Sequence, residues 1–406
     1  MRAAEKCFPD GTPMEKWFGE TEAPELSAMG PACSLAEAGI RPDGRIHTAE
    51  IQALIDRTHE NGGGVLVIPA GTWMSGALFF RPGVHLYIAE GAVLLGSDDP
   101  ADYPVTETRI EGESCLYLPA LINADRCDGF TLSGPGTIDG NGLRSWKAFW
   151  QRRSWNPECT NKDEQRPRLV FISSSRNVTI SGLRLQNAAF WTSHVYRCRY
   201  VKYLNCSFYS PYEPVKAPST DTIDIDACED VLVKGCEIHV NDDGVALKGG
   251  KGPWADRQPE NGSNERILIE DCHYAYSHGC LTLGSEAIHC RNVILRRIRV
   301  DDGFNLLWLK FRPDTPQLFE YITVEDVSGK ADNFLNVHRW TQFFNPGERT
   351  DVPPSAARHI TMRRCEVTCD TYCQAPEDLT GYELSDFRLE NLRVDYKERG
   401  NTGWIR

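Results

Sequence analysis

The sequence has no excess of positive charge. Its 406 residues include 44 Lys and Arg against 57 Asp and Glu, which gives a formal net charge of -13. A protein that binds nucleic acid needs a basic surface, so this balance argues against a nucleic-acid partner. It places no limit on a substrate, because an acidic protein can still line one cleft with Lys and Arg.

The N-terminus has no basic segment followed by an apolar run. Residues 1–31 are therefore interpreted as neither a signal peptide nor a membrane span, and no membrane partner is predicted. We expect a cytoplasmic protein. The alternative is a secreted or periplasmic protein whose signal peptide is missing from this sequence.

The 15 cysteines are odd in number and lack a tight metal-binding spacing. Cys365, Cys369 and Cys373 recur every four residues, but no nearby Cys or His pair completes a zinc set. Four cysteines occupy the same point of a repeat: Cys206, Cys236, Cys272 and Cys365. A free Cys packs as a small apolar residue, so we expect them in a stacked core, reduced, as in a cytoplasmic protein.

Internal repeats dominate the second half of the chain. Each unit has alternating apolar residues, a two-residue bend and apolar residues again, which indicates short strands meeting at a corner. The units are residues 177–185, 200–208, 230–238, 266–274, 292–300, 321–327, 359–367 and 386–394. They begin about 23 to 38 residues apart, too irregularly for leucine-rich or hexapeptide arrays. They predict an all-β fold, a right-handed parallel β-helix; a β-sandwich would not repeat this unit eight times.

The first third of the chain differs. Residues 48–59 place apolar side chains at helical spacing and stop before three glycines at 62–64. Because a β-helix exposes its core at each end, we expect this helix to cap the N-terminal end. The predicted organisation is an N-terminal extension, residues 1–32, and one catalytic β-helix domain, residues 33–406.

Acidic residues gather in two successive repeats. Asp221 lies in one repeat and the pair Asp242-Asp243 in the next, where Gly244 allows a turn. If one repeat is one coil, three carboxylates surround a small volume, as hydrolysis of a glycosidic bond requires. The next repeats place His278 and then Lys310 on the same strip.

These motifs resemble glycoside hydrolase family 28, the polygalacturonase-like pectinases. The family signatures Asn-Thr-Asp, Asp-Asp, Gly-His-Gly and Arg-Ile-Lys correspond, in order, to the segments at 219–221, 242–243, 277–279 and 308–310. The likeness runs from about residue 33 to residue 330.

The resemblance implies a role for each matched residue. Asp242 would be the general acid, and Asp221 and Asp243 would hold and deprotonate the attacking water. His278 and Lys310 would bind the sugar, with Lys310 pairing its carboxylate. An inverting enzyme of this kind keeps its acid and base about 6.5–9.5 Å apart.

One departure from the family bears on the substrate. The family Arg is Trp308 here, and Arg312, two residues after the Lys, is a candidate replacement. A stacking surface in place of a planar fork leaves room for a rhamnogalacturonan backbone. Weaker candidates for substrate binding are Lys248 and His194.

An insertion rich in Gly, Pro and Asn spans residues 249–264. Exo-acting bacterial relatives carry a loop in this region that closes one end of the cleft, so the resemblance implies release of terminal units. We therefore predict an inverting exo-galacturonidase acting on pectic oligosaccharides, without metal or cofactor. The alternatives are a rhamnogalacturonan hydrolase, a calcium-dependent pectate-lyase-type enzyme, and a binding or tail-spike-like β-helix without catalysis.

Overall fold

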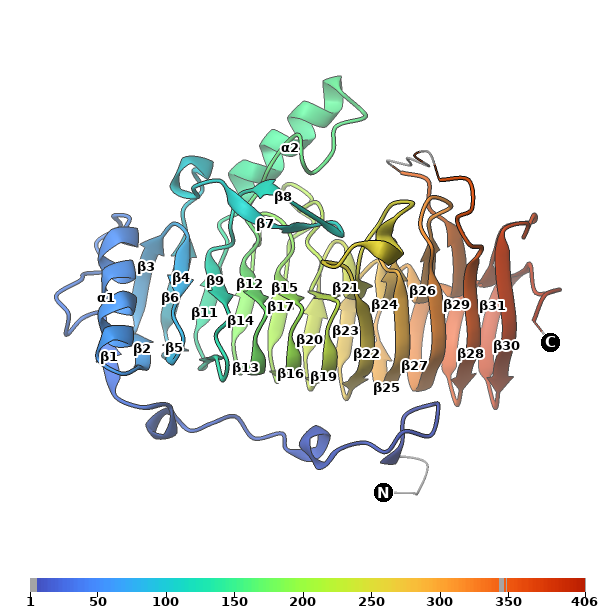
Figure 1. Cartoon of the computed structure of the whole chain (residues 1–406), viewed down its shortest axis with the longest axis horizontal. Coiled ribbons are helices and arrows are strands. Elements are labelled where there is room, and N and C mark those ends of the chain that lie inside the picture. Colours follow the sequence, from blue (N-terminus) through green and yellow to red (C-terminus); the bar gives the residue numbers. More distant parts are fainter. Residues whose placement is uncertain (1–5, 343–346, 348, 406) are drawn as a thin grey trace.

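The computed structural model describes residues 6–342, 347 and 349–405. Within these ranges the chain winds into a right-handed parallel β-helix whose coils stack along one long axis (Figure 1). Strands of successive coils pair in parallel along three ladders, which we call A, B and C. The predicted fold class is confirmed.

The ladders run the length of the molecule. Ladder A consists of β1 (Ala32–Ser34), β2 (Gly64–Ile68), β5 (Val84–Ile88), β10 (Thr131–Ser133), β13 (Arg176–Ser181), β16 (Arg199–Leu204), β19 (Glu229–Lys234), β22 (Ser263–Glu270), β25 (His289–Val300), β27 (Leu318–Arg339), β28 (Ser355–Arg363) and β30 (Tyr382–Glu390). Ladder B consists of β3 (Gly71–Ser75), β6 (Ala92–Gly96), β11 (Thr137–Asp139), β14 (Arg184–Gln186), β17 (Ser207–Tyr209), β20 (Glu237–His239), β23 (His273–Tyr276), parts of β25 and β27, β29 (Glu366–Gln374) and β31 (Arg393–Gly400). Ladder C consists of β4 (Leu78–Phe80), β9 (Ile122–Asp125), β12 (Val170–Ser173), β15 (Ser193–Tyr196), β18 (Ile223–Asp226), β21 (Asp243–Lys248), β24 (Gly279–Gly284), β26 (Asn305–Phe311) and the ends of β27 and β29.

The corners of the coil explain the repeat. The first residue of every repeat unit has a positive φ of 50–59°: Asn177, Tyr200, Asp230, Arg266, Asn292, Tyr321, His359 and Asp386. The predicted bend inside each unit is a second such corner: Gly182, Asn205, Gly235, Asp271, Arg297, Asp326, Arg364 and Asn391. Left-handed backbone is uncommon for residues other than Gly, Asn and Asp, so each coil is bent sharply at two fixed places. The register of the coils follows from these corners.

Helix α1 (Thr48–Glu60) covers the N-terminal end of the coil, as predicted (Figure 1). Its buried face carries Ile51, Leu54 and Ile55, and it packs against β2, β3 and β4, one strand from each ladder. These residues cover apolar side chains of the first coil that would otherwise face water.

The sequence did not predict two elements that lie over ladder C. One is the antiparallel hairpin of β7 (Thr106–Ile110) and β8 (Glu113–Tyr117), and the other is helix α2 (Leu143–Trp155) (Figure 1). Both fall between residues 106 and 155, where the chain shows no repeat unit. Short 3-10 helices occur at Lys16–Gly19, Leu26–Met29, Pro100–Asp102 and Ala255–Arg257.

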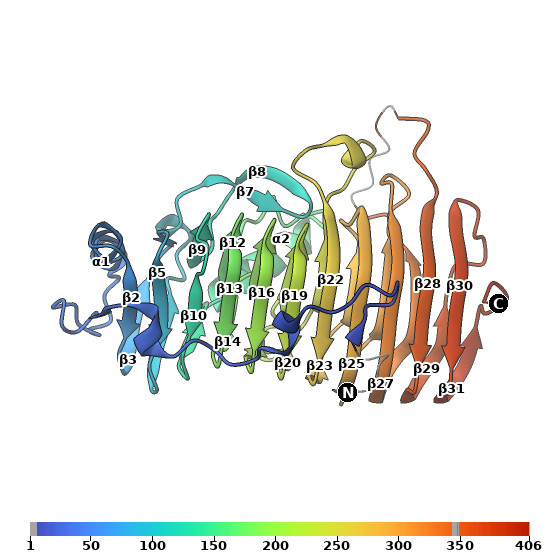
Figure 2. The same cartoon turned by 60° about the horizontal axis from the view of Figure 1, so that its bottom comes forward.

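The segment before β1 runs along the outside of ladder A (Figure 2). Phe8 and Phe18 are buried there against an apolar stripe formed by Leu204, Leu232, Leu268 and Ile294. A carboxylate oxygen of Asp10 lies 2.8 Å from a guanidinium nitrogen of Arg291. The division of the chain into residues 1–32 and 33–406 stays a prediction.

The stacked cysteines lie in the core. Cys206, Cys236, Cys272 and Cys365 are all buried and unpaired, as predicted. Cys369 and Cys373 are buried too. Among the described helices, none is both long and apolar enough to cross a membrane.

Candidate active site

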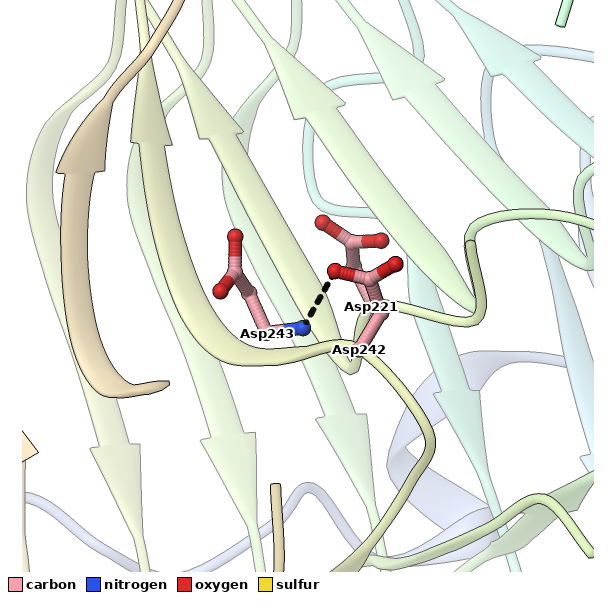
Figure 3. Close-up of side chains that lie close together, drawn as sticks. All are labelled: Asp221, Asp242 and Asp243. Atoms are coloured by element: carbon pink, nitrogen blue, oxygen red, sulfur yellow. Dashed lines mark hydrogen bonds between the residues drawn. The ribbon is translucent and has the colours of Figure 1, made fainter. Parts of the chain in front are cut away.

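Three carboxylates meet on ladder C. Asp221 lies just before β18, and Asp242 and Asp243 stand at the start of the next strand, β21. The backbone N–H of Thr222 donates to the carbonyl oxygen of Asp243 over 2.9 Å, which holds the two strand starts in register. One oxygen of each carboxylate lies within 4.8 Å of the others, and Figure 3 shows the three side chains pointing from the sheet in a common direction.

Gly244 lets the acid pair lie this close to the sheet. A Cβ at this position would stand 2.5 Å from a ring carbon of Tyr274 and 2.9 Å from the carbonyl oxygen of Gly279. Only glycine fits without moving backbone. In the resulting turn the N–H of Asp243 donates to a carboxylate oxygen of Asp242 over 3.0 Å (Figure 3).

Asp243 is held by a buried ion pair. The Lys310 ammonium lies 2.7 Å from one of its oxygens, and the Thr282 hydroxyl donates to the other over 2.9 Å. The same ammonium lies 3.8 Å from the ring centre of Trp308 and 4.9 Å from that of Trp340. Lys310 is therefore engaged by the protein on several sides, and Trp308 acts on it as a packing surface.

Asp242 is the most exposed of the three, with 28% of its side chain accessible. Burial alone would raise its pKa, but the nearby His278, together with Lys310 and Lys248, brings the pKa below its usual value. Nδ1 of His278 lies 3.7 Å from the carboxylate, and the imidazole stacks on Phe304 with ring centres 4.6 Å apart.

The pKa of Asp221 is shifted in the opposite direction, above its usual value. Its burial raises its pKa well above the usual value, and the negative charges of Asp242 and Asp224 raise it further, against the opposing effect of Lys248. Like charges packed together cannot all ionise, so the cluster keeps a proton at a pH where an isolated Asp has none. Burial also raises the pKa of Asp224 well above its usual value, so Asp221 and Asp224 are the carboxyl groups of the cluster that favour the protonated form.

Lys248 ties the cluster to two further acids that the sequence did not single out as site residues. Its ammonium lies 3.6 Å from Asp224 and 3.4 Å from Glu286, and it stands 5.2 Å from the ring centre of Trp191. Burial alone would lower the pKa of Lys248, but the surrounding carboxylates raise it well above its usual value. Lys248 thus remains charged and balances part of the negative charge.

A cavity of about 180 Å³ opens over the carboxylates. Lys248, Glu286 and Lys310 line it together with the three aspartates. Its other walls include Glu111 from the β7–β8 hairpin, Phe149 and Arg153 from α2, Asn161 and Trp340. The sequence missed the walls from the hairpin and α2; the one available signal was Gly112 between two runs of alternating residues, a pattern typical of a hairpin turn.

Two predicted binding residues lie away from this cavity. His194 is completely buried on ladder C, where Arg168 donates to its Nδ1 over 2.7 Å and Asp226 lies 3.4 Å from its Nε2. Arg312 is 2% exposed and forms an ion pair of 2.9 Å with Asp314. The structure thus does not bring either side chain to the aspartates, and neither residue lines the cavity.

The spacing of the carboxylates leaves the expected inversion a prediction. The 4.8 Å limit joins one selected oxygen of each group, whereas the value of about 6.5–9.5 Å for an inverting glycosidase separates the two carboxyl groups. The same oxygens lie close enough together to ligate a cation, which would have to compete with Lys310 for Asp243 and with His278 for Asp242.

Comparisons with known proteins identify what this site is similar to. The family model "Glycosyl hydrolases family 28" matches residues 106–305. A probable polygalacturonase of Vitis vinifera is 27% identical over 274 residues, which are 64% of this chain and 53% of that protein. A polygalacturonase of Ralstonia solanacearum is 27% identical over 334 residues, 68% of this chain and 60% of that protein. The chain thus spans between half and two thirds of the length of these relatives.

Solved structures share the fold. An exopolygalacturonase from Thermotoga maritima superposes with a TM-score of 0.74 at 21% identity, covering 95% of this chain and 93% of that one. A family 28 exopolygalacturonase from Yersinia enterocolitica gives a TM-score of 0.68 at 19% identity, covering 92% and 77%. Together with the family model, these similarities confirm the predicted resemblance.

The raised pKa of Asp221 predicts a pH-dependent effect on stability. At neutral pH the unfolded chain ionises Asp221, whereas the folded site favours its protonated form; below about pH 4 both states are protonated. Asp221→Asn should therefore raise the melting temperature by about 2–5 °C at pH 7.5 and much less at pH 4.5.

Asp226→Asn is the matched control, because Asp226 is an equally buried aspartate on β18 that pairs with Arg109 at 3.0 Å. Its removal leaves a buried guanidinium without its ion-pair partner and should lower the melting temperature at pH 7.5. Calorimetry of both variants at the two pH values checks the prediction. A loss of stability in Asp221→Asn at pH 7.5 like that in the control would contradict it.

Proposed function

Because the chain belongs to the polygalacturonase-like glycoside hydrolase family 28, we propose that it hydrolyses pectic chains and releases galacturonic acid from their ends. The observation that carries this proposal is the meeting of Asp221, Asp242 and Asp243 at the floor of a small cavity. Hydrolysis of a glycosidic bond needs an acid that protonates the leaving oxygen and a base that deprotonates water. The three aspartates, which lie on two neighbouring coils, can supply both.

The proposed mechanism divides the work among the three carboxylates. Asp242 delivers a proton to the leaving oxygen, while Asp221 and Asp243 hold the attacking water. A proton that the cluster keeps in the free site passes to Asp242 when the sugar displaces solvent. Lys310 pairs with Asp243 and orients it as the base, and the product forms with inversion.

Exo action is supported by the walls of the cavity. The cavity of about 180 Å³ is walled by the β7–β8 hairpin, by α2 and by the sheet. The hairpin tip closes one side, since a Cβ on Gly112 would stand 2.9 Å from the Cβ of Glu286 and 3.0 Å from the backbone of Gly250.

Polar contacts fix this hairpin in place. Nδ2 of Asn161 donates to Glu111 over 2.6 Å, and the Lys251 ammonium lies 3.8 Å from Glu111 and 3.5 Å from Glu113. The predicted insertion therefore contributes to the closed end together with the hairpin, which the sequence did not predict.

A second candidate is hydrolysis of rhamnogalacturonan. The observation that favours it is Trp308, which stands where the family has Arg and packs on Lys310. Because Lys310 is already paired with Asp243, the sugar unit beside Lys310 does not need a carboxylate and can be neutral. A calcium-dependent lyase is less well supported, because Lys310 and His278 already pair with two of the three carboxylates.

Product analysis tests the proposed function. Oligogalacturonides and rhamnogalacturonan oligosaccharides are incubated separately with the protein, with and without EDTA, and the products are identified by mass spectrometry. We expect free galacturonic acid from the first set, unaffected by EDTA. Cleavage of the second set alone would establish the second candidate instead, and unsaturated products lost with EDTA would show a lyase.

The hairpin wall makes a separate prediction. Replacing residues 107–116 with a short Gly-Ser linker should open the cavity, so that early digests of a pentagalacturonide contain oligomers as well as monomer. Leu116→Ser, at a side chain that is 64% exposed on the same hairpin, should leave the monomer pattern unchanged. If the linker variant still released monomer alone, the hairpin would not be the end wall.

A further inference from the structure

Most cations close to the reacting carboxylates are neutralised by acids of the protein. Lys310 pairs with Asp243, and Lys248 lies between Asp224 and Glu286. Arg312, which lies away from the cavity, pairs with Asp314. A carboxylate of the substrate would have to displace one of these partners. The cations that the family resemblance assigned to the substrate are therefore poorly placed to receive it.

Arg153 at the cavity wall and Lys216 beside His278 have no carboxylate partner of this kind. Arg153 of α2 lines the cavity with its guanidinium 5.2 Å from the ring centre of Phe149. The Lys216 ammonium lies 3.4 Å from Nε2 of His278 and 5.7 Å from the ring centre of Tyr212. Within the part of the chain that the structure describes, neither Arg153 nor Lys216 has a carboxylate oxygen within the 4.0 Å of an ion pair.

Aromatic side chains surround Lys216, and we call this set the aromatic rim: Trp150, Tyr212, His278 and Phe304. Three of them are exposed, Tyr212 by 57%, Phe304 by 38% and Trp150 by 36%. Trp150 Nε1 donates to the carbonyl oxygen of Lys216 over 2.7 Å, and His278 stacks on Phe304. The rim thus offers apolar ring faces around one unpaired ammonium, which suits a sugar with an apolar ring face and a carboxylate.

Asp242 joins the rim to the cavity. It lines the cavity, and its carboxylate also faces His278, which does not line the cavity. A proton donor at this place serves a glycosidic oxygen that lies between one sugar in the cavity and the next sugar on the rim.

We propose that Arg153 and Lys216 recognise the carboxylates of two successive uronic acid units on either side of the bond that is cleaved. Arg153 binds the terminal unit in the cavity. Lys216 binds the leaving unit, whose ring lies on the aromatic rim. This inference rests on the proposed function and deepens it: the family Arg that is Trp308 here is replaced by cations from α2 and from the loop before β18, and the substrate is charged on both sides of the bond.

The test uses trigalacturonides with a methyl ester on the terminal unit, on the next unit, or on neither. Arg153→Met should lower kcat/KM for the free acid about 10- to 100-fold and should remove the wild-type preference for an unesterified terminal unit. Lys216→Met should do the same for the second unit only. Arg153→Lys and Lys216→Arg should recover part of each preference, because they keep the charge.

Lys147→Met is the matched control, since Lys147 is an exposed lysine on the same helix as Arg153. It should keep wild-type kinetics. Calorimetric binding of trigalacturonide, with each substitution placed in an Asp242→Asn background, gives a readout apart from turnover and should weaken for Arg153→Met and Lys216→Met.

Unchanged ester preferences and unchanged binding in folded Arg153→Met and Lys216→Met would overturn the inference while leaving the proposed function intact. A wild-type protein that cleaves none of the trigalacturonides would instead overturn the proposed function.

Discussion

Parallel register between neighbouring coils is the constraint on which the site depends. Strands of adjacent coils lie about 4.8 Å apart, so residues at equivalent positions are stacked whatever the length of the loops between them. Asp221 and the pair Asp242-Asp243 become neighbours in this way, and Lys310 is added two strands later. Two left-handed corners in each coil keep that register by fixing where the chain turns.

The same register concentrates negative charge where water is scarce. Asp221, Asp224 and Asp243 are all at most 4% exposed. Two features of the site reduce the repulsion between their carboxylates. Lys310 and Lys248 neutralise part of the charge, and the raised pKa of Asp221 keeps one proton in the cluster. The raised pKa of Asp221 lowers the stability of the fold at neutral pH. A site for the proposed hydrolysis tolerates this cost, because the reaction needs one protonated and one ionised carboxyl group side by side.

The sequence was sufficient for features that depend on periodicity. The repeat units predicted the ladders and their inner corners, the apolar spacing of residues 48–59 predicted α1, and coil stacking predicted that the three aspartates meet. It was insufficient where the chain leaves the repeat. The hairpin and α2 lie in residues 106–155, so Glu111 and Arg153 carried no signal. The sequence also did not predict which acid each cation pairs with. Only the structure shows the ion pairs of Lys310 with Asp243 and of Arg312 with Asp314.

The central claim is that Asp242 protonates the leaving oxygen while Asp221 acts on water. The most direct measurement compares Asp242→Asn and Asp221→Asn on digalacturonide and on an aryl galacturonide whose phenolate leaves without a proton. General acid catalysis contributes about 10²- to 10⁴-fold, so Asp242→Asn should lose that factor on the disaccharide and keep most of its rate on the aryl substrate. Asp221→Asn should lose activity on both. Equal losses on the two substrates in Asp242→Asn would contradict the account.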